Sequence, residues 1–293
     1  MLMEYIYIYV SLAVLGLCLG SYAAATVWRL RARQLAQDKR DGEKVSQREY
    51  DKLAPLATTS VKKDYSRCLH CQHKLAWYDM LPVVSWVQIR GKCRYCRKPI
   101  GWLEPAAEVG LALFFVISFW LWPVALYDPL SISLFVIWLV AGVMLTILFI
   151  YDLKWFLLPN QVMYPLIGLG IIAACLHLLP TQSVDQLVSM LAAVAILSGI
   201  YYLLWAVSKG TWIGFGDVKL GLALALLLGR WELAFIALFA ANIIGCIIVL
   251  PGMLTGKIKR TSHVPFGPLL IAGYVVAGLW GMVIVDYYFS IAI

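Results

Sequence analysis

The chain of 293 residues is 62% hydrophobic and only 14% charged, and it carries a formal net charge of +8 at pH 7. A soluble core could not bury this much apolar surface, whereas a membrane-spanning helix needs about 20 predominantly apolar residues. The composition therefore excludes an ordinary soluble protein and predicts an all-α, polytopic integral membrane protein.

Successive apolar runs predict about eight transmembrane helices. They lie at about 5–28, 105–127, 131–151, 161–180, 185–207, 217–229, 232–255 and 266–291. The sixth is short for a full span. The first opens on Glu4 and tyrosines instead of a basic segment, so we expect no cleavable signal peptide. The 12 tryptophans and 16 tyrosines are expected mainly at the membrane interfaces.

A basic segment, residues 29–104, determines the predicted orientation. It holds 17 of the 24 Lys and Arg but only 8 of the 16 Asp and Glu, a net charge of +9. The positive-inside rule places this segment in the cytoplasm and the N-terminus outside. Later loops fit the same alternation, since only Arg230 falls outside and six basic residues fall inside: Lys154, Lys209, Lys219, Lys257, Lys259 and Arg260. The charge excess is expected to contact anionic lipid, and no nucleic-acid partner is predicted.

The charge distribution also divides the chain into three predicted parts. Residues 1–28 are the first transmembrane helix, residues 29–104 a small cytoplasmic domain, and residues 105–293 a multi-helix transmembrane domain. Within the cytoplasmic domain, residues 31–66 mix Lys and Arg with Asp and Glu and show no strong apolar stripe. We expect them to form a solvated helix or a mobile arm, and no chemistry is assigned to them.

Four cysteines in the cytoplasmic domain form two CxxC pairs. Cys68 and Cys71 are followed after 21 residues by Cys93 and Cys96. Four thiolates at this spacing can surround one tetrahedral ion, and a cytoplasmic location disfavours structural disulfides. Because four protein ligands leave no position open for water, the pattern predicts a structural zinc knuckle. A thiol oxidoreductase site is the alternative, since CxxC pairs also occur in those enzymes.

Two aspartates lie at the ends of apolar runs. Asp152 follows the third run, and Asp217 ends a Gly-Phe-Gly-Asp motif before the sixth, so the predicted orientation places both at the cytoplasmic face. Ionisable groups at such depth are functional candidates, and a close carboxylate pair can activate water and donate a proton. Gly214 and Gly216 would let the backbone adopt conformations closed to other residues and approach an extended substrate. The alternatives are an interfacial cap or a partner of Lys154 for Asp152, and an N-cap for Asp217.

Several motifs together resemble the type IV prepilin peptidase family of GxGD-type membrane aspartic peptidases. They run through nearly the whole chain in the family's order: Gly20-Ser21-Tyr22, Arg29-Leu30, the cysteine segment 66–100, Glu108, Asp152 with Leu158-Pro159-Asn160, Gly214 to Leu220, and Pro265-Phe266-Gly267-Pro268. A GxGD motif alone would be weak evidence for this family, but the full set of motifs is specific to it. Three departures are Ala24, where many members have Asn, Leu69, where Pro commonly follows the first cysteine, and the unusual composition of the charged arm before Cys68.

The resemblance implies an enzyme of the bacterial inner membrane. Such an endopeptidase removes the leader from type IV prepilins or type II secretion pseudopilins, cutting after Gly, and then methylates the new N-terminus with S-adenosylmethionine. Asp152 and Asp217 would be catalytic. The implied substrate-binding residues are Glu108, Gly214, Gly216, Pro265, Phe266 and Gly267. For Glu108 the alternative is a first-turn acid that the helix dipole favours, and for Pro265 to Pro268 a simple turn before the last helix.

A function of a different class stays open at this point. The chain could be an ion or proton-coupled transporter in which Asp152 and Asp217 bind cations or relay protons, with the cysteine domain as a regulatory module. Polar residues are sparse elsewhere in the apolar runs, which disfavours a conducting path.

Overall fold

The computed structural model describes residues 2–57, 65–180, 183–256 and 264–292. These residues are mainly helical and contain no named strand, only two isolated β-bridges that join Arg67 to Lys74 and Lys92 to Pro99. The all-α prediction is confirmed. Three basic residues of the orientation argument, Lys257, Lys259 and Arg260, lie outside the described residues.

Seven helices within the described ranges are long and apolar enough to cross a membrane. They match seven of the eight predicted spans. The remaining one, predicted at 217–229, is the 14-residue helix α9, Phe215–Leu228, which is short for a span, as expected. The chain is therefore a polytopic membrane protein.

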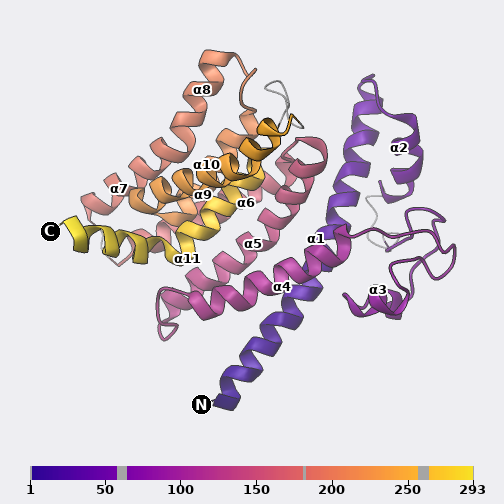
Figure 1. The fold of residues 1–293 in the computed structure, drawn as a ribbon, viewed down its shortest axis with the longest axis horizontal. Helices are drawn as coiled ribbons and strands as arrows, with labels where there is room; N and C mark the ends of the chain where they lie inside the picture. The colour runs from indigo at the N-terminus through magenta and orange to yellow at the C-terminus, as the bar shows by residue number, and fades with distance from the viewer. Residues whose placement is uncertain (1, 58–64, 181–182, 257–263, 293) are drawn as a thin grey trace. The chain divides into compact units, whose positions relative to one another are not determined.

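The chain forms two compact units, Met1–Phe119 and Trp120–Ile293 (Figure 1). The elements of the first are α1 (Leu2–Arg40), α2 (Gln47–Leu53), η1 (Ala54–Leu56), η3 (Trp77–Asp79), α3 (Val84–Gln88) and α4 (Leu103–Leu121). Those of the second are α5 (Pro129–Trp155), α6 (Asn160–Leu178), α7 (Val184–Val194), η4 (Ala195–Gly199), α8 (Ile200–Ser208), α9, α10 (Trp231–Leu254) and α11 (Gly267–Ala292). The division into three parts stays a prediction.

Part of the charged arm is packed, which corrects the expectation of a solvated helix or mobile arm. Helix α1 continues to Arg40, and Ala32 and Leu35 on it form a small buried cluster with Leu53 and Leu56. A bidentate ion pair, in which Arg31 Nε and Nη2 each lie 2.9 Å from a Glu49 carboxylate oxygen, joins α1 to α2. Four apolar residues on two short segments make no stripe in the sequence, so only the folded hairpin reveals this core.

Helix α9 lies at the centre of the second unit, where it contacts α6, α7, α8, α10, α11 and η4. The predicted helix 185–207 is interrupted by the π-helical turn η4, and the crossing with α9 is at this turn. A Cβ on Gly221 would lie 2.0 Å from the Leu197 carbonyl oxygen, so only glycine permits this approach. Beside it, the Ser198 hydroxyl donates to the Val218 carbonyl at 3.0 Å.

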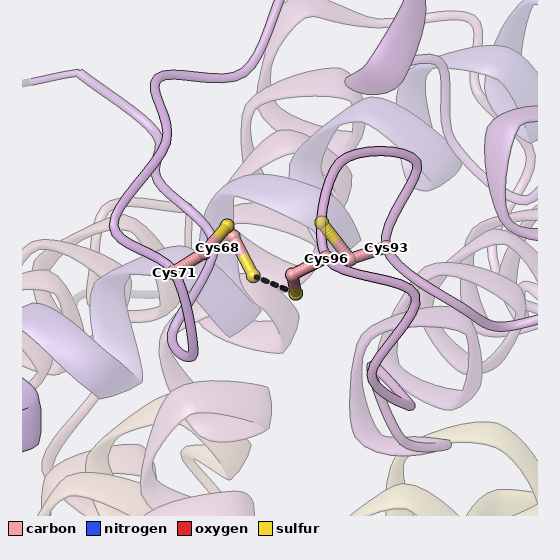
Figure 2. Close-up of side chains that lie close together, drawn as sticks. All are labelled: Cys68, Cys71, Cys93 and Cys96. Atoms are coloured by element: carbon pink, nitrogen blue, oxygen red, sulfur yellow. Dashed lines mark hydrogen bonds between the residues drawn. The ribbon is translucent and has the colours of Figure 1, made fainter.

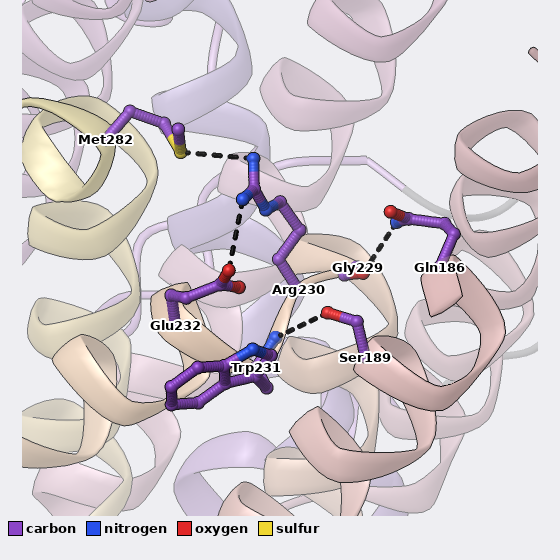
Figure 3. Close-up of polar contacts among 7 residues, drawn as sticks. All are labelled: Gln186, Ser189, Gly229, Arg230, Trp231, Glu232 and Met282. Carbon is purple, nitrogen blue, oxygen red and sulfur yellow. Dashed lines mark hydrogen bonds and ion pairs between the residues drawn. The ribbon is translucent and has the colours of Figure 1, made fainter. Parts of the chain in front are cut away.

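The end of α9 that lies away from Asp217 is held by polar contacts to α7 (Figure 3). Gln186 donates its side-chain amide to the carbonyl of Gly229 at 3.1 Å, and the Trp231 N–H donates to the Ser189 hydroxyl at 3.2 Å. Gly229 ends the helix with φ of +67°, a conformation that glycine adopts without strain. These contacts hold the C-terminal end of α9 against α7.

Candidate functional site

Asp152 lies in the last turn of α5 and its side chain is buried. The helix ends because Phe156 adopts a left-handed conformation, with φ of 54°, and donates its N–H to the Asp152 carbonyl at 2.9 Å. The Asp152 carboxylate accepts the backbone N–H of Gly267, 115 residues further along the chain, at 3.1 Å. Only 6% of Asp152 is exposed, so an interfacial cap, which would face water, does not describe this residue.

Asp217 is the third residue of α9 and lies half-buried. The N-cap of this helix is Gly214, whose carbonyl accepts the Asp217 N–H at 3.1 Å, and no side chain caps the helix. The alternative of Asp217 as an N-cap is therefore wrong. The two carboxylates come from helices α5 and α9, and the segments that carry them meet where Gly216 packs against Leu158. The structure thus brings together two acids that lie 65 positions apart.

The Pro-Phe-Gly segment before α11 contacts Asp152 through its backbone. Gly267 is buried and begins α11, and its N–H points at the Asp152 carboxylate. A Cβ at this position would lie 2.7 Å from Asp152 Oδ2. Glycine is therefore required here by space, because any side chain would displace the carboxylate or the start of α11.

We expect Gly267→Ala to lower the free energy of unfolding by about 1–3 kcal/mol, the usual cost of overpacking a buried position. The control is Gly168→Ala in α6, where a Cβ would meet nothing within 4 Å, so this change should be neutral or slightly stabilising. Thermal unfolding of both purified variants in detergent checks the prediction. Equal melting temperatures for Gly267→Ala and the wild type would contradict the close approach.

The two glycines of the Gly-Phe-Gly-Asp motif behave differently from the expectation. Gly214 has φ of −74° and ψ of 146°, and Gly216 is helical with an ordinary negative φ, so neither uses a conformation closed to other residues. A Cβ on Gly216 would lie 3.1 Å from a methyl carbon of Leu158. A side chain at Gly216 would thus press against Leu158, and a close approach to substrate at either glycine stays a prediction.

Polar and aromatic contacts hold the first turns of α6 and α9 together. Lys219 donates to the side-chain oxygen of Asn160 at 2.7 Å, and its ammonium lies 5.1 Å from the ring centroid of Tyr164 and 5.4 Å from that of Phe215. The Phe215 ring also packs on Trp205 of α8, with the centroids 5.0 Å apart. The first turns of α9, which carry Asp217, therefore contact α6 through Lys219 and α8 through Phe215.

The sequence prediction missed one buried polar residue beside these aspartates, Tyr201 in α8. Its ring packs on Phe266 with the centroids 5.2 Å apart, and 4% of the residue is exposed. A tyrosine within an apolar helix resembles an interface residue in the sequence, and no spacing rule connects it to Asp217. Only the α8–α9 packing places it here.

The four predicted metal ligands converge in the first unit (Figure 2). The sulfur atoms of Cys68, Cys71, Cys93 and Cys96 all lie within 4.8 Å of one another, and those of Cys68 and Cys96 are 3.9 Å apart. Four sulfurs that each lie 2.3 Å from a tetrahedral zinc would be about 3.8 Å apart. The cluster therefore fits a metal ion of this kind.

The two CxxC loops have the same backbone design. Each has a residue with positive φ directly after its second cysteine, Gln72 at 60° and Arg97 at 55°. Each first cysteine donates its N–H to a carbonyl across its loop, Cys68 to His73 at 3.0 Å and Cys93 to Lys98 at 2.8 Å. Such tight turns direct two sulfurs to one side of the loop, as a shared ion requires.

Burial makes the Cys68 thiol a poor anion without a cation. Burial raises the pKa of the Cys68 thiol to about 12, so the isolated group would be neutral at pH 7. A coordinated metal keeps such a thiol deprotonated. The set of four sulfur donors and the burial of Cys68 and Cys93 therefore fit a structural metal.

Asp79, in the segment between the two loops, forms hydrogen bonds with the second loop. Its carboxylate accepts Arg94 Nε at 2.9 Å and the Tyr95 hydroxyl at 3.0 Å, both within the second loop. Burial works against the charge of Asp79, but these two hydrogen bonds prevail and lower its pKa below the usual value. Asp79 is thus ionised at neutral pH and stabilises the second loop.

Glu108 lies in the first unit, on α4, and is buried. Because α4 begins at Leu103 and not at the predicted residue 105, Glu104 is the acid of the first turn and Glu108 lies in the second. The Glu108 carboxylate accepts the Val83 N–H at 2.7 Å. Glu108 therefore anchors the start of α3 to α4, which a dipole-stabilised first-turn acid would not do.

Comparison with known proteins gives two family matches. Residues 14–122 match the bacterial peptidase A24 N-terminal domain, and residues 139–250 match the type IV leader peptidase family. The first match covers the metal-ligand cysteines and Glu108, and the second covers both aspartates. Together they include most of the sequence-predicted site residues.

Curated relatives match along nearly the full length. The prepilin leader peptidase/N-methyltransferase of Stutzerimonas stutzeri is 28% identical over 95% of this chain and 93% of its own. The protein of that name from Aeromonas hydrophila is 28% identical over 97% of this chain and 95% of its own. That from Burkholderia pseudomallei strain 1026b is 30% identical, over 89% of this chain and 81% of its own. No solved structure matches.

The motifs that carried the resemblance thus lie in a helical membrane protein that aligns with these relatives over 89% to 97% of its length. Such identity over such coverage, with both family matches in order along the chain, shows that this protein belongs to the type IV prepilin leader peptidase/N-methyltransferase family.

Proposed function

We propose that this protein is a membrane aspartic endopeptidase that removes the leader peptide of type IV prepilins or pseudopilins, cutting after Gly. The observation that carries the proposal is the pairing of Asp152 and Asp217, from α5 and α9, at one end of the second unit. The family match supports this peptidase activity and gives no support to the transporter alternative.

The pair can hydrolyse a peptide bond by sharing a proton. Two neighbouring carboxyls cannot both ionise easily, so one is a carboxylate and the other an acid. The carboxylate takes a proton from water as the water oxygen attacks the carbonyl carbon, and the acid donates its proton to the carbonyl oxygen. The tetrahedral intermediate then collapses, the C–N bond breaks, and a proton passes to the leaving amine. The Gly267 N–H holds the Asp152 carboxylate in place.

The proposed location is the bacterial inner membrane, with the N-terminus outside and the aspartates at the cytoplasmic face. Lys154, Lys209 and Lys219 lie at the ends of α5, α8 and α9 that adjoin the aspartates, which supports this orientation. A prepilin whose apolar helix lies in the membrane would present its basic leader at that face.

A second activity, N-methylation of the new N-terminus, is proposed from the names of the relatives. S-adenosylmethionine supplies the methyl group when it is bound. The amine must lose a proton before it can attack a methyl sulfonium, and we propose that Glu108 accepts this proton. Its carboxylate already acts as a hydrogen-bond acceptor, from the Val83 N–H, which fits that role.

Mass spectrometry of a prepilin co-expressed with this protein tests both activities, because leader loss and one added methyl are separate mass changes. We expect both changes with the wild type. With Glu108→Gln we expect methylation to fall at least as much as cleavage, by about 10-fold or more, because the amide still accepts the Val83 N–H but takes up no proton. Full methylation by Glu108→Gln would remove this residue from the reaction. Cleavage without any methyl would confine the protein to proteolysis.

A further inference from the structure

The hydroxyl of Tyr201 is buried in the fold but forms no hydrogen bond with another described residue. Its oxygen is buried and has no hydrogen-bond partner among the described residues. Buried hydroxyl groups are almost always paired, because an unpaired one loses its bonds to water without replacement. The buried, unpaired Tyr201 hydroxyl is therefore available to form a hydrogen bond with a bound ligand.

The packing of η4 and α8 shows which way this side chain faces. Ser198, one turn before Tyr201, contacts the carbonyl of Val218, and Trp205, one turn after it, packs on Phe215. Residues spaced three and four apart share one face of a helix. Tyr201 therefore faces the turn of α9 between Phe215 and Val218, which carries Asp217.

Two further observations place the hydroxyl beside the carboxylate pair. Tyr201 faces the turn of α9 that carries Asp217, and the two side chains form no direct hydrogen bond. On the other side, the Tyr201 ring packs on Phe266, whose neighbour Gly267 binds Asp152. The hydroxyl thus lies near both acids and is left free to bond to a third group.

We propose that Tyr201 is a catalytic residue of the peptidase, whose hydroxyl donates a hydrogen bond to the carbonyl oxygen of the scissile peptide and holds it in the tetrahedral intermediate. This inference rests on the proposed peptidase function and adds a residue to it. The tyrosine keeps its proton throughout: the two aspartates move the protons, and the Tyr201 hydroxyl polarises the carbonyl and holds its oxygen in place while the protonated aspartate transfers its proton to that oxygen. A donor that is already oriented and shielded from water is effective in this role.

The test compares Tyr201→Phe with Tyr202→Phe in the full-length protein, purified in detergent. Tyr202 is the neighbouring residue, half-exposed and stacked near Trp205 at 6.0 Å, so it is a matched control outside the site. The substrate is a synthetic prepilin peptide with a basic leader, a Gly-Phe junction and an apolar helix. We expect Tyr201→Phe to lower kcat by about 10²-fold, the effect of losing one such donor, with KM nearly unchanged. Tyr202→Phe should retain wild-type values.

A second measurement separates chemistry from folding. Phenylalanine fills the same space, and it removes a buried hydroxyl that has no partner in the fold, so Tyr201→Phe should melt at or above the wild-type temperature. A lowered kcat with undiminished stability is the result that supports the proposal. Wild-type kcat in Tyr201→Phe overturns it, as does a rise in KM alone, or a loss of stability that accounts for the lower activity.

The same assay distinguishes this inference from the proposed function. If the wild type cleaves the peptide and Tyr201→Phe cleaves it equally well, only the role of Tyr201 fails. If the folded wild type leaves the peptide intact, the peptidase function itself fails and the inference falls with it.

Discussion

Asp152→Asn and Asp217→Asn are each expected to reduce prepilin cleavage by about 10⁴-fold or more, the scale seen when one member of a catalytic set is removed. The amide has nearly the shape of the carboxylate, but it neither takes a proton from water nor returns one. Since the two acids are proposed to act as a unit, the double variant should be hardly worse than either single one. Cleavage of a co-expressed prepilin, followed by mass spectrometry, measures the effect.

The control for the aspartates is Asp185→Asn. Asp185 lies in the first turn of α7, which begins at the opposite end of the spans from the aspartate pair, so its charge should not affect cleavage. Membrane insertion and melting temperature must be measured for every variant, because lost activity counts only in a folded protein. Substantial cleavage by either Asp152→Asn or Asp217→Asn would contradict the proposed mechanism.

Loss of the metal is the second large effect that we expect. The purified wild type should contain about one zinc per chain, and serine at Cys68, Cys71, Cys93 or Cys96 should reduce this to near zero. Each change removes one of four sulfurs that lie within 4.8 Å of one another. Zinc binding by such sites contributes about 10 kcal/mol or more to folding, so residues 66–98 should lose their structure. Elemental analysis and limited proteolysis check both effects.

Cys246→Ser supplies the control for the cysteines. Cys246 is an exposed cysteine of α10 in the second unit, and its replacement should leave the zinc content unchanged. Prepilin cleavage by the metal-free protein should fall because residues 66–98 lose their structure, while the aspartates are intact. A metal-free preparation with full activity, or a Cys68–Cys71 disulfide in cells, would instead favour the thiol oxidoreductase alternative.

Two features of this protein followed from the sequence by itself because their signals are local. Apolar runs of about 20 residues must become helices in lipid, where every backbone polar group needs a partner within the chain. The two CxxC pairs likewise predicted that their four sulfurs lie close together, because each pair is short and four thiolates can bind one ion. The family resemblance rested on motifs of the same local kind, and the comparisons confirm it.

Tertiary structure decided what depends on contacts between distant segments. The Gly267 N–H reaches Asp152 across 115 positions, and the Tyr201 hydroxyl comes to lie near Asp217 only because α8 crosses α9. In the arm, Leu35 and Leu53 are buried against each other although the surrounding sequence is highly charged. No periodicity encodes these pairings, because they depend on how whole helices pack. The sequence alone therefore determined which segments are long and apolar enough to span the membrane and which residues are candidates for the chemistry. Packing decided how Gly267 and Tyr201 come to lie near the aspartates.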